Sequence, residues 1–199
     1  MTHPDLIARL EAALVQQGSP TSDFDLNPDI ALPPGRVLRP AAVLIAIERT
    51  ASGGQVLLTK RSSKLKHHPG QIAFPGGKLD PGDADLQAAA LREAWEEVGL
   101  PPETVRIIGK LPSHETVTGF QVTPFVAELR GPFTPVAEAG EVEDVFTVPL
   151  RHVLDPAQFT VERRRWRGVW RQYYAVPYGP YYTWGATARI LYKLAEMAA

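Results

Sequence analysis

The chain has 199 residues, of which 44% are hydrophobic and 22% charged, a composition typical of one globular domain with its own core. Its formal net charge of −1 disfavours nucleic acid and membranes as partners held by bulk charge, and the absence of cysteine excludes disulfides, thiolate metal sites and cysteine nucleophiles. The longest unbroken apolar run, 41–47, is too short to span a bilayer, and Asp5 and Glu11 interrupt any signal-peptide core. We therefore expect a soluble, cytoplasmic protein.

The first part of the chain predicts a helix, a loop and two strands. Apolar residues at helical spacing predict an amphipathic helix over 3–17, and the Pro-, Asp-, Ser- and Gly-rich stretch 18–36 predicts a long loop. The apolar run 39–49 predicts a buried strand, joined in a hairpin to a second strand at 55–61 by a Ser-Gly-Gly turn. The Pro- and Gly-rich stretch 62–83 predicts no regular element.

The second part of the chain alternates helices and strands. A helix is predicted over 84–98, closed by Gly99 as its C-cap. The later elements are two strands, a short helix, two further strands and a final helix, at 105–111, 122–129, 149–154, within 158–176 and at 184–197. This mixture predicts an α/β or α+β domain, which we place at 37–199. The N-terminal helix and loop, 1–36, are predicted to be appended to it, with packing and contact within a homodimer both open as their role.

The predicted helix that ends before the Gly99 C-cap contradicts two rules of helix stability. Glu93 and Glu97 lie about 40° apart on one face, with Glu96 beside them, and like charges at this spacing repel each other. Glutamates in the last turn also oppose the helix dipole. A missing cation would explain both departures, and Mg²⁺ or Mn²⁺ suits hard oxygen ligands. The alternative is a solvated acidic surface; the preceding Gly76-Gly77, which lets the backbone approach a ligand, favours the metal site.

These residues form part of a longer pattern: Gly77, Asp83, Arg92-Glu93, Glu96-Glu97 and Gly99-Leu100. The pattern resembles the Nudix box, the signature of the Nudix hydrolases, whose usual form is G-x5-E-x7-R-E-U-x-E-E-x-G-U. Its second half matches, with Ala94 at one bulky position. Its first half departs, because aligning Gly77 puts Asp83 at the glutamate position with eight residues before Arg92 instead of seven. We interpret Asp83 and Asp85 mainly as stabilisers of the helix N-terminus.

A second motif precedes the box: Leu57-Leu58-Thr59-Lys60-Arg61-Ser62, Lys66, Gly70 and Phe74-Pro75-Gly76-Gly77. It is similar to the pattern L-L-T-x-R-S/A-x3-R-x3-G-x3-F-P-G-G of coenzyme A-type Nudix pyrophosphatases, with Lys66 in place of Arg. The resemblance implies an α/β/α sandwich around a mixed β-sheet. It also implies metal-dependent hydrolysis of the diphosphate of coenzyme A, or of an acyl or oxidised form of it. The products would be 3′,5′-ADP and 4′-phosphopantetheine or its acyl derivative.

The resemblance also implies roles for individual residues. Glu93, Glu96 and Glu97 would be the metal ligands and catalytic carboxylates, and Arg92 would orient a box glutamate by ion pairing. Glu141 is a candidate for a distal metal ligand or a general base, and a plain surface glutamate is the alternative. The expected substrate contacts are with the phosphates of the small-molecule substrate, from Arg61 and Lys66 together with Gly76 and Gly77.

The basic, aromatic segment 163–171 allows several interpretations. In a strand, Arg163 and Arg165 would lie on one face and Arg164 and Trp166 on the other. Such a surface suits a 3′-phosphate and adenine, or single-stranded nucleic acid, and it also suits an edge strand protected by charge. For the whole protein, the alternatives are a Nudix hydrolase of another nucleotide such as ADP-ribose or a dinucleoside polyphosphate, or a non-catalytic nucleotide-binding module.

Overall fold

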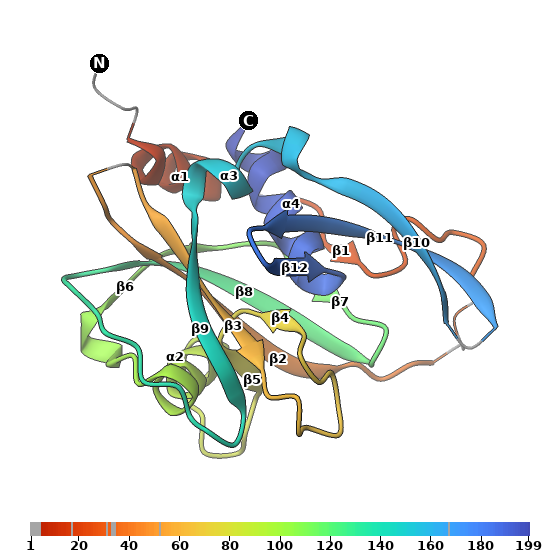
Figure 1. Cartoon of the computed structure of the whole chain (residues 1–199), viewed down its shortest axis with the longest axis horizontal. Helices are drawn as coiled ribbons and strands as arrows, with labels where there is room; N and C mark the ends of the chain where they lie inside the picture. The colour runs from red at the N-terminus through yellow and green to blue at the C-terminus, as the bar shows by residue number, and fades with distance from the viewer. Residues whose placement is uncertain (1–4, 17, 31, 33–34, 52, 167) are drawn as a thin grey trace.

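The computed structural model describes residues 5–16, 18–30, 32, 35–51, 53–166 and 168–199, and within them nine strands form one mixed sheet with helices on both faces (Figure 1). The strands of this central sheet are β1 (Thr21–Ser22), β2 (Arg39–Glu48), β3 (Gln55–Arg61), β4 (Ile72–Ala73), β5 (Gly76–Lys78), β6 (Val105–Lys110), β7 (His114–Glu115), β8 (Phe120–Leu129) and β9 (Val142–Pro149). The helices are α1 (Leu6–Leu14), α2 (Leu86–Val98), α3 (Leu150–Val153) and α4 (Ala186–Ala198), with 3₁₀ turns η1 (Pro102–Thr104) and η2 (Pro156–Gln158). The predicted α/β/α architecture is confirmed.

Strand β2 lies in the middle of the central sheet. It pairs in parallel with β8 along its whole length, and antiparallel with β3 at only two residue pairs beside the connecting turn. The predicted hairpin is therefore present but short. Beyond the turn the two strands separate: β3 pairs with β9, and β2 pairs with β5. The space between the separated parts of β2 and β3 admits β5. Gly76 and Gly77, which belong to β5, thereby join the sheet beside β2.

The two faces of β2 belong to two separate cores. One core joins Ala42, Leu44 and Ala46 of β2 to Ala89, Ala90, Ala94 and Val98 of α2. The other joins Ile45 and Ile47 of β2 to Ile7 and Leu10 of α1 and to Leu191 and Leu194 of α4. Small alanine side chains on both sides allow α2 to lie close to the sheet. This close packing fixes the position of the acidic side chains of α2, among which Glu97 lies on the buried side of the helix.

A second, antiparallel sheet lies on the side of the central sheet that carries α4, and consists of β10 (Thr160–Trp166), β11 (Val169–Tyr178) and β12 (Tyr181–Trp184). The β10–β11 hairpin extends away from α2 (Figure 1). Its register pairs Arg165 with Trp170 and Arg163 with Gln172, so Arg163 and Arg165 share a face as expected, together with their two partners. Arg163 also lies over the Trp170 ring, 5.4 Å from its centroid.

Several short strands were not expected. The loop predicted at 18–36 contains β1, and the stretch 62–83, predicted to hold no regular element, contains β4 and β5. Strands β7 and β12 were not anticipated either. Each has two to four residues, too few for a hydrophobic period to show. β1 and β5 pair with strands distant in sequence, whereas β12 pairs with the preceding strand β11.

The predicted helices are shorter than expected at their ends. The helix expected over 3–17 is α1, capped by the side chain of Asp5; residues 1–4 and 17 lie outside the described residues. The final helix starts at Ala186, because Trp184 is the last residue of β12. None of the helices among the described residues is long and apolar enough to cross a membrane.

A buried polar contact holds the N-terminal segment to the sheet. The side chain of His114 on β7 is fully buried, and its Nδ1 lies 2.9 Å from Thr21 Oγ1 of β1. Its Nε2 lies 3.1 Å from Asp23 Oδ1, and Asp23 Oδ2 accepts a hydrogen bond from Val117 N at 2.8 Å. These bonds satisfy the buried imidazole and explain why the two-residue strand β1 forms at this edge.

Candidate active site

The acidic face of α2 is held in place by well-defined helix ends. The side chain of Asp85 is the N-cap and accepts a hydrogen bond from Ala88 N at 2.8 Å. Gly99 is the C-cap, in the left-handed conformation with φ 70°, as predicted. Beyond it, the segment 131–140 runs along the last turn: Val136 N donates to Val98 O, and Glu138 N donates to the backbone oxygen of Glu97, each at 2.9 Å.

Gly76 and Gly77 lie directly against this helix. Gly76 has φ 154°, and a Cβ there would lie 2.6 Å from Val43 Cα. A Cβ at Gly77 would overlap the carboxylate of Glu93, lying 2.5 Å from its Cδ. Both positions therefore require glycine, the first for the approach of two backbones and the second for the position of Glu93.

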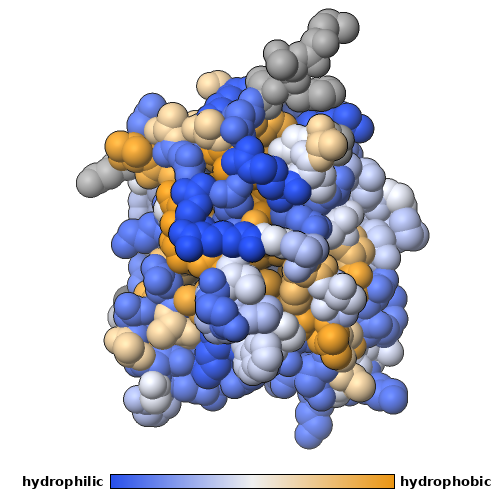
Figure 2. Space-filling view, turned by 90° about the vertical axis from the view of Figure 1, so that its left-hand side faces the viewer, coloured by the Kyte–Doolittle hydropathy of each residue, from blue (hydrophilic) through white to orange (hydrophobic). Residues whose placement is uncertain are grey.

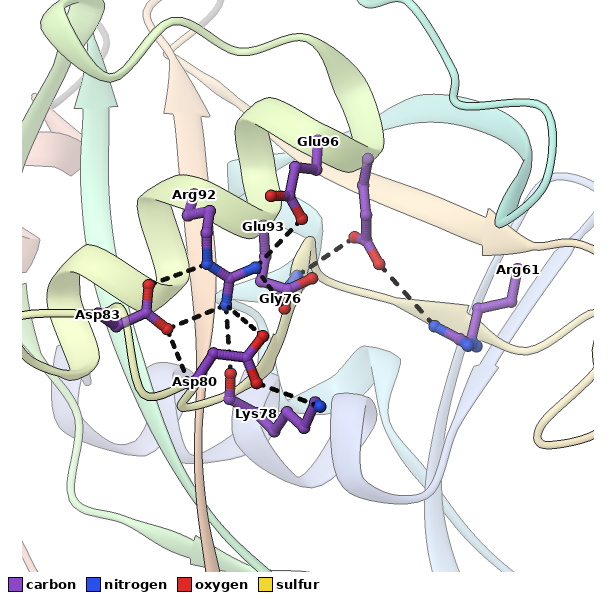
Figure 3. Close-up of polar contacts among 9 residues, drawn as sticks. Arg61, Gly76, Lys78, Asp80, Asp83, Arg92, Glu93 and Glu96 are labelled. Atoms are coloured by element: carbon purple, nitrogen blue, oxygen red, sulfur yellow. Dashed lines mark hydrogen bonds and ion pairs between the residues drawn. The ribbon is translucent and has the colours of Figure 1, made fainter.

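Glu97 is a buried carboxylate. Its side chain is 5% exposed, its Oε2 accepts a hydrogen bond from Gly76 N at 3.2 Å, and Arg61 Nη1 lies 3.9 Å from its Oε1 (Figure 3). Burial raises the pKa of Glu97 to about 8, and the charges of Glu93 and Glu141 add to the rise. The buried Arg61 Nε has no hydrogen-bond partner among the described residues. This end of the site therefore contains a carboxylate and a guanidinium that are not fully satisfied.

Arg92 gathers the remaining acidic side chains (Figure 3). Its Nη1 lies 3.0 Å from Glu93 Oε1 and 3.1 Å from Glu96 Oε2. On its other side, Nε and Nη2 donate to the two carboxylate oxygens of Asp83 at 2.9 and 3.0 Å, a bidentate pair. Arg92 holds the pKa of Asp83 down at about 2, whereas burial raises the pKa of Glu93. The guanidinium thus fixes the carboxylates on both sides of it.

The position of Asp83 corrects one expectation and extends another. Asp83 was interpreted as a stabiliser of the helix N-terminus, but only Asp85 caps α2; Asp83 binds Arg92 and accepts a hydrogen bond from Asp80 N at 2.8 Å. Asp83 thus sits against the box arginine despite the extra residue between them. The Gly77 alignment was the only sequence signal for this contact. Asp80, 3.8 Å from Arg92, was given no role from the sequence.

The other expected site residues lie at different distances from this cluster. Glu141 is exposed in the turn before β9, close enough for its charge to raise the pKa of both Glu93 and Glu97. Lys66 is exposed in the loop between β3 and β4, and among the described residues it forms no ion pair with the acidic side chains. The segment 163–171, whose Arg167 lies outside the described residues, belongs to the second sheet and not to this cluster.

The donor chemistry of the cluster suits a hard divalent cation. The charge of Glu93 raises the pKa of Glu97 by repulsion, which a bound cation would relieve. As they stand, no three His, Asp or Glu side chains of the described residues are placed to hold an ion together. Arg92 engages one oxygen each of Glu93 and Glu96 and so holds both side chains in place. The second oxygen of each carboxylate makes no contact with Arg92, which leaves it available for a cation.

Comparison with known proteins identifies relatives of this chain. A family model described as the NUDIX domain matches residues 38–167. The chain is 47% identical over 157 residues to a protein of Enterobacter sp. (strain 638) named uncharacterized Nudix hydrolase NudL, covering 79% of this chain and 81% of the relative. A relative with the same name from Citrobacter koseri is 46% identical with the same coverage. A solved MutT/nudix family protein from Enterococcus faecalis has a TM-score of 0.51 at 15% identity, covering 83% of this chain and 64% of that one; it supports the fold alone.

Proposed function

This chain belongs to the Nudix family of hydrolases, and we propose that it cleaves the diphosphate of coenzyme A or a coenzyme A derivative, with a divalent metal ion held by Glu93, Glu96 and Glu97. Nudix hydrolases generally require an ion such as Mg²⁺ or Mn²⁺. The observation that carries the proposal is the buried carboxylate of Glu97, held beside Glu93 and against the Gly76 backbone without a full counter-charge. A diphosphate with its cation supplies what this site lacks.

In the proposed reaction, a water oxygen bonds to one phosphorus and the bridging P–O bond breaks. The products are 3′,5′-ADP and 4′-phosphopantetheine, and the protons released go to a carboxylate or to solvent. A divalent ion, when bound, neutralises the diphosphate and lowers the pKa of water. Glu141, whose charge reaches both Glu93 and Glu97, is proposed as a distal ligand or as the base that accepts the proton.

The cationic residues are proposed to bind and orient. Arg92 holds Glu93 and Glu96, so we assign it a positioning role and not a contact with substrate. Arg61 is the proposed phosphate ligand, because it reaches the site with a buried, unsatisfied Nε. Lys66, on the exposed loop that follows β3, would reach a phosphate as a point charge. The backbone at Gly76 and Gly77 would lie against the diphosphate.

The choice of coenzyme A rests on the motif Leu57–Gly77 that precedes the box. ADP-ribose and dinucleoside polyphosphates need the same metal chemistry and are the first alternatives. A non-catalytic nucleotide-binding module is the second. It is disfavoured because Arg92, Glu93, Glu96 and Glu97 are all present and gathered at one end of α2. The division into 1–36 and 37–199, a cytoplasmic location and a homodimer stay predictions.

The test is hydrolysis of coenzyme A with Mg²⁺ or Mn²⁺, with product identification and with ADP-ribose assayed in parallel. We expect 3′,5′-ADP, formed only with metal. Glu97→Gln should lose this activity while remaining folded. Glu103→Gln, on the exposed turn η1, is the matched control and should keep it. Turnover of ADP-ribose alone would refute the substrate, and activity in Glu97→Gln would refute the site.

A further inference from the structure

The charge of this chain is unevenly distributed along its length. The segment 160–178, which forms β10 and β11, carries five arginines against one glutamate. The remaining 180 residues therefore carry 16 Lys and Arg against 21 Asp and Glu. The near-zero net charge thus hides a hairpin with a net charge of +4 on a body with a net charge of −5. A local basic surface of this kind attracts a polyanion even where the molecule as a whole does not.

The hairpin projects from the molecule and is anchored at its base. Its turn reaches the right-hand side of Figure 1, on the side away from α2. The side chain of Asn27 holds the backbone of Gln172: Oδ1 accepts a hydrogen bond from Gln172 N at 2.8 Å, and Nδ2 donates to Gln172 O at 2.9 Å. The outer part of the hairpin is therefore presented to solvent from a fixed base.

Exposed hydrophobic side chains gather on the same sheet. Of the large hydrophobic side chains that are exposed among the described residues, half belong to β10, β11 and β12. Figure 2 shows the side of the molecule that faces away from the hairpin, where hydrophobic surface lies in separate patches among hydrophilic groups. The second sheet thus combines positive charge with exposed rings, which points to a partner that has both anionic groups and flat apolar surfaces.

One face of the hairpin brings two cations and a ring together. Arg163 and Arg165 lie two residues apart on β10, about 7 Å at the rise of a strand, and Arg165 is paired with Trp170. Trp170 is 60% exposed, and Arg163 Cζ lies 5.4 Å from the centroid of its ring. Arg165 Nε donates to Gly168 O at 3.3 Å. We call Arg163, Arg165 and Trp170 the basic aromatic face.

The arginines of the basic aromatic face have no acidic partners in the part of the chain that the structure describes. Arg163 and Arg165 form no ion pair there, whereas Arg106 and Arg189 each bind two carboxylates. Their charges are therefore available to an anionic ligand.

Protection of a sheet edge explains only part of this surface. Strand β10 is an edge of the second sheet, and charges on an edge strand discourage pairing with another chain. Trp170, however, lies on β11, the middle strand of the sheet. Edge protection therefore does not account for its exposed ring, and a ligand that stacks on the ring does.

We propose that the basic aromatic face binds single-stranded nucleic acid. Its arginines pair with phosphates, and the Trp170 ring stacks on a base, whose faces a single strand exposes and a duplex covers. All five cations of the segment 160–178 are arginines, which bind phosphate through two parallel hydrogen bonds and also stack on bases. An anionic membrane attracts Lys and Arg alike, and an acidic peptide offers Trp170 no base. The surface is separate from the acidic cluster, so this inference goes beyond the proposed function.

The experiment measures the binding of a fluorescein-labelled oligothymidylate, and of an oligouridylate of the same length, by anisotropy at several salt concentrations without divalent metal. Arg163→Gln combined with Arg165→Gln should make the slope of log K against log salt shallower by about 1.4, since each phosphate contact contributes about 0.7. Trp170→Ala should weaken binding roughly 5- to 150-fold and leave this slope unchanged, whereas Trp170→Phe should keep most of the affinity. A stronger response to one of the two strands identifies DNA or RNA as the source of the ligand.

Matched controls remove the same groups elsewhere. Arg130→Gln combined with Arg151→Gln takes two charges from exposed positions outside the hairpin, and Trp95→Ala takes an exposed ring from α2. Both controls should bind the oligonucleotides as the wild-type protein does. Thermal unfolding is measured for every variant.

Absence of binding to both strands at low salt, or wild-type binding by the double arginine variant, would overturn the inference. So would tighter binding of a duplex of the same sequence, of poly-glutamate or of phosphatidylserine vesicles than of the single strand. Hydrolysis of coenzyme A by the double arginine variant should equal that of the wild type. A loss of hydrolysis would assign these arginines to the substrate instead.

Discussion

Replacing Gly77 by alanine tests whether the position of Glu93 matters for catalysis. The new Cβ would lie 2.5 Å from Glu93 Cδ, whereas ordinary van der Waals contact is 3.4–4 Å. The carboxylate must therefore retreat by about 1 Å. A displacement of this size at a reacting group costs on the order of 100-fold in rate. We expect kcat/KM for diphosphate hydrolysis to fall by about this factor.

The fold should tolerate the same change, because Gly77 lacks a left-handed φ and the clash is with a side chain that can move. The assay is steady-state hydrolysis with Mg²⁺, combined with thermal unfolding. Gly82→Ala is the control: it also lacks a left-handed φ, and its Cβ would meet no atom within 4 Å. Wild-type activity in Gly77→Ala would refute the reasoning. So would a large loss of stability, because the activity loss would then reflect unfolding.

Three further outcomes are expected. The pKa of Glu97 is raised to about 8, so between about pH 4.5 and pH 8 the folded state keeps a proton that the unfolded chain releases. The free energy of unfolding of the metal-free protein should therefore fall as the pH rises through this range. Glu97→Gln should abolish that fall and stabilise the protein at pH 8 by roughly 1–3 kcal/mol, as measured by denaturant titration. If the free energy of unfolding of the variant depended on pH as that of the wild type does, the burial argument would be contradicted. Asp83→Ala should lower kcat/KM, because it releases Arg92. Asp85→Ala removes the N-cap of α2, so it should cost about 1 kcal/mol of stability and leave kcat/KM unchanged. Equal effects of the two variants on kcat/KM would show that the ion pair of Asp83 with Arg92 has no role in catalysis. Leu10→Ala should cost about 2–5 kcal/mol in the same titration because this α1 side chain is fully buried, and a cost below about 1 kcal/mol would show that α1 is only loosely attached.

The helix that carries the acids was the part of the fold best predicted from sequence. Gly99 and the prolines after it end α2 where expected, and the spacing of Glu93 and Glu97 depends only on helix geometry. Local patterns also gave the bounds of β2 and β3 to within a residue. These features succeed because each is decided by residues adjacent in the chain.

What the sequence did not predict depends on distant pairing. The parallel pairing of β2 with β8 brings together residues about 80 positions apart, and no local period signals it. The contact of Asp83 with Arg92 depends on how the turn before α2 folds back, which the spacing alone does not specify. The link from segment 131–140 to α2 is made by backbone groups, so no side-chain pattern marks it.

That backbone link has a consequence for how the protein can diversify. The two hydrogen bonds that join segment 131–140 to the last turn of α2 are made by main-chain atoms, which every non-proline residue provides. Most side chains of the segment are exposed, so they are free to change without loosening it. Descendants of this chain can therefore exchange side chains of segment 131–140 while the acids of α2 keep their positions. The residues that are free to vary and the acidic residues of the candidate site thus lie on different segments of the chain.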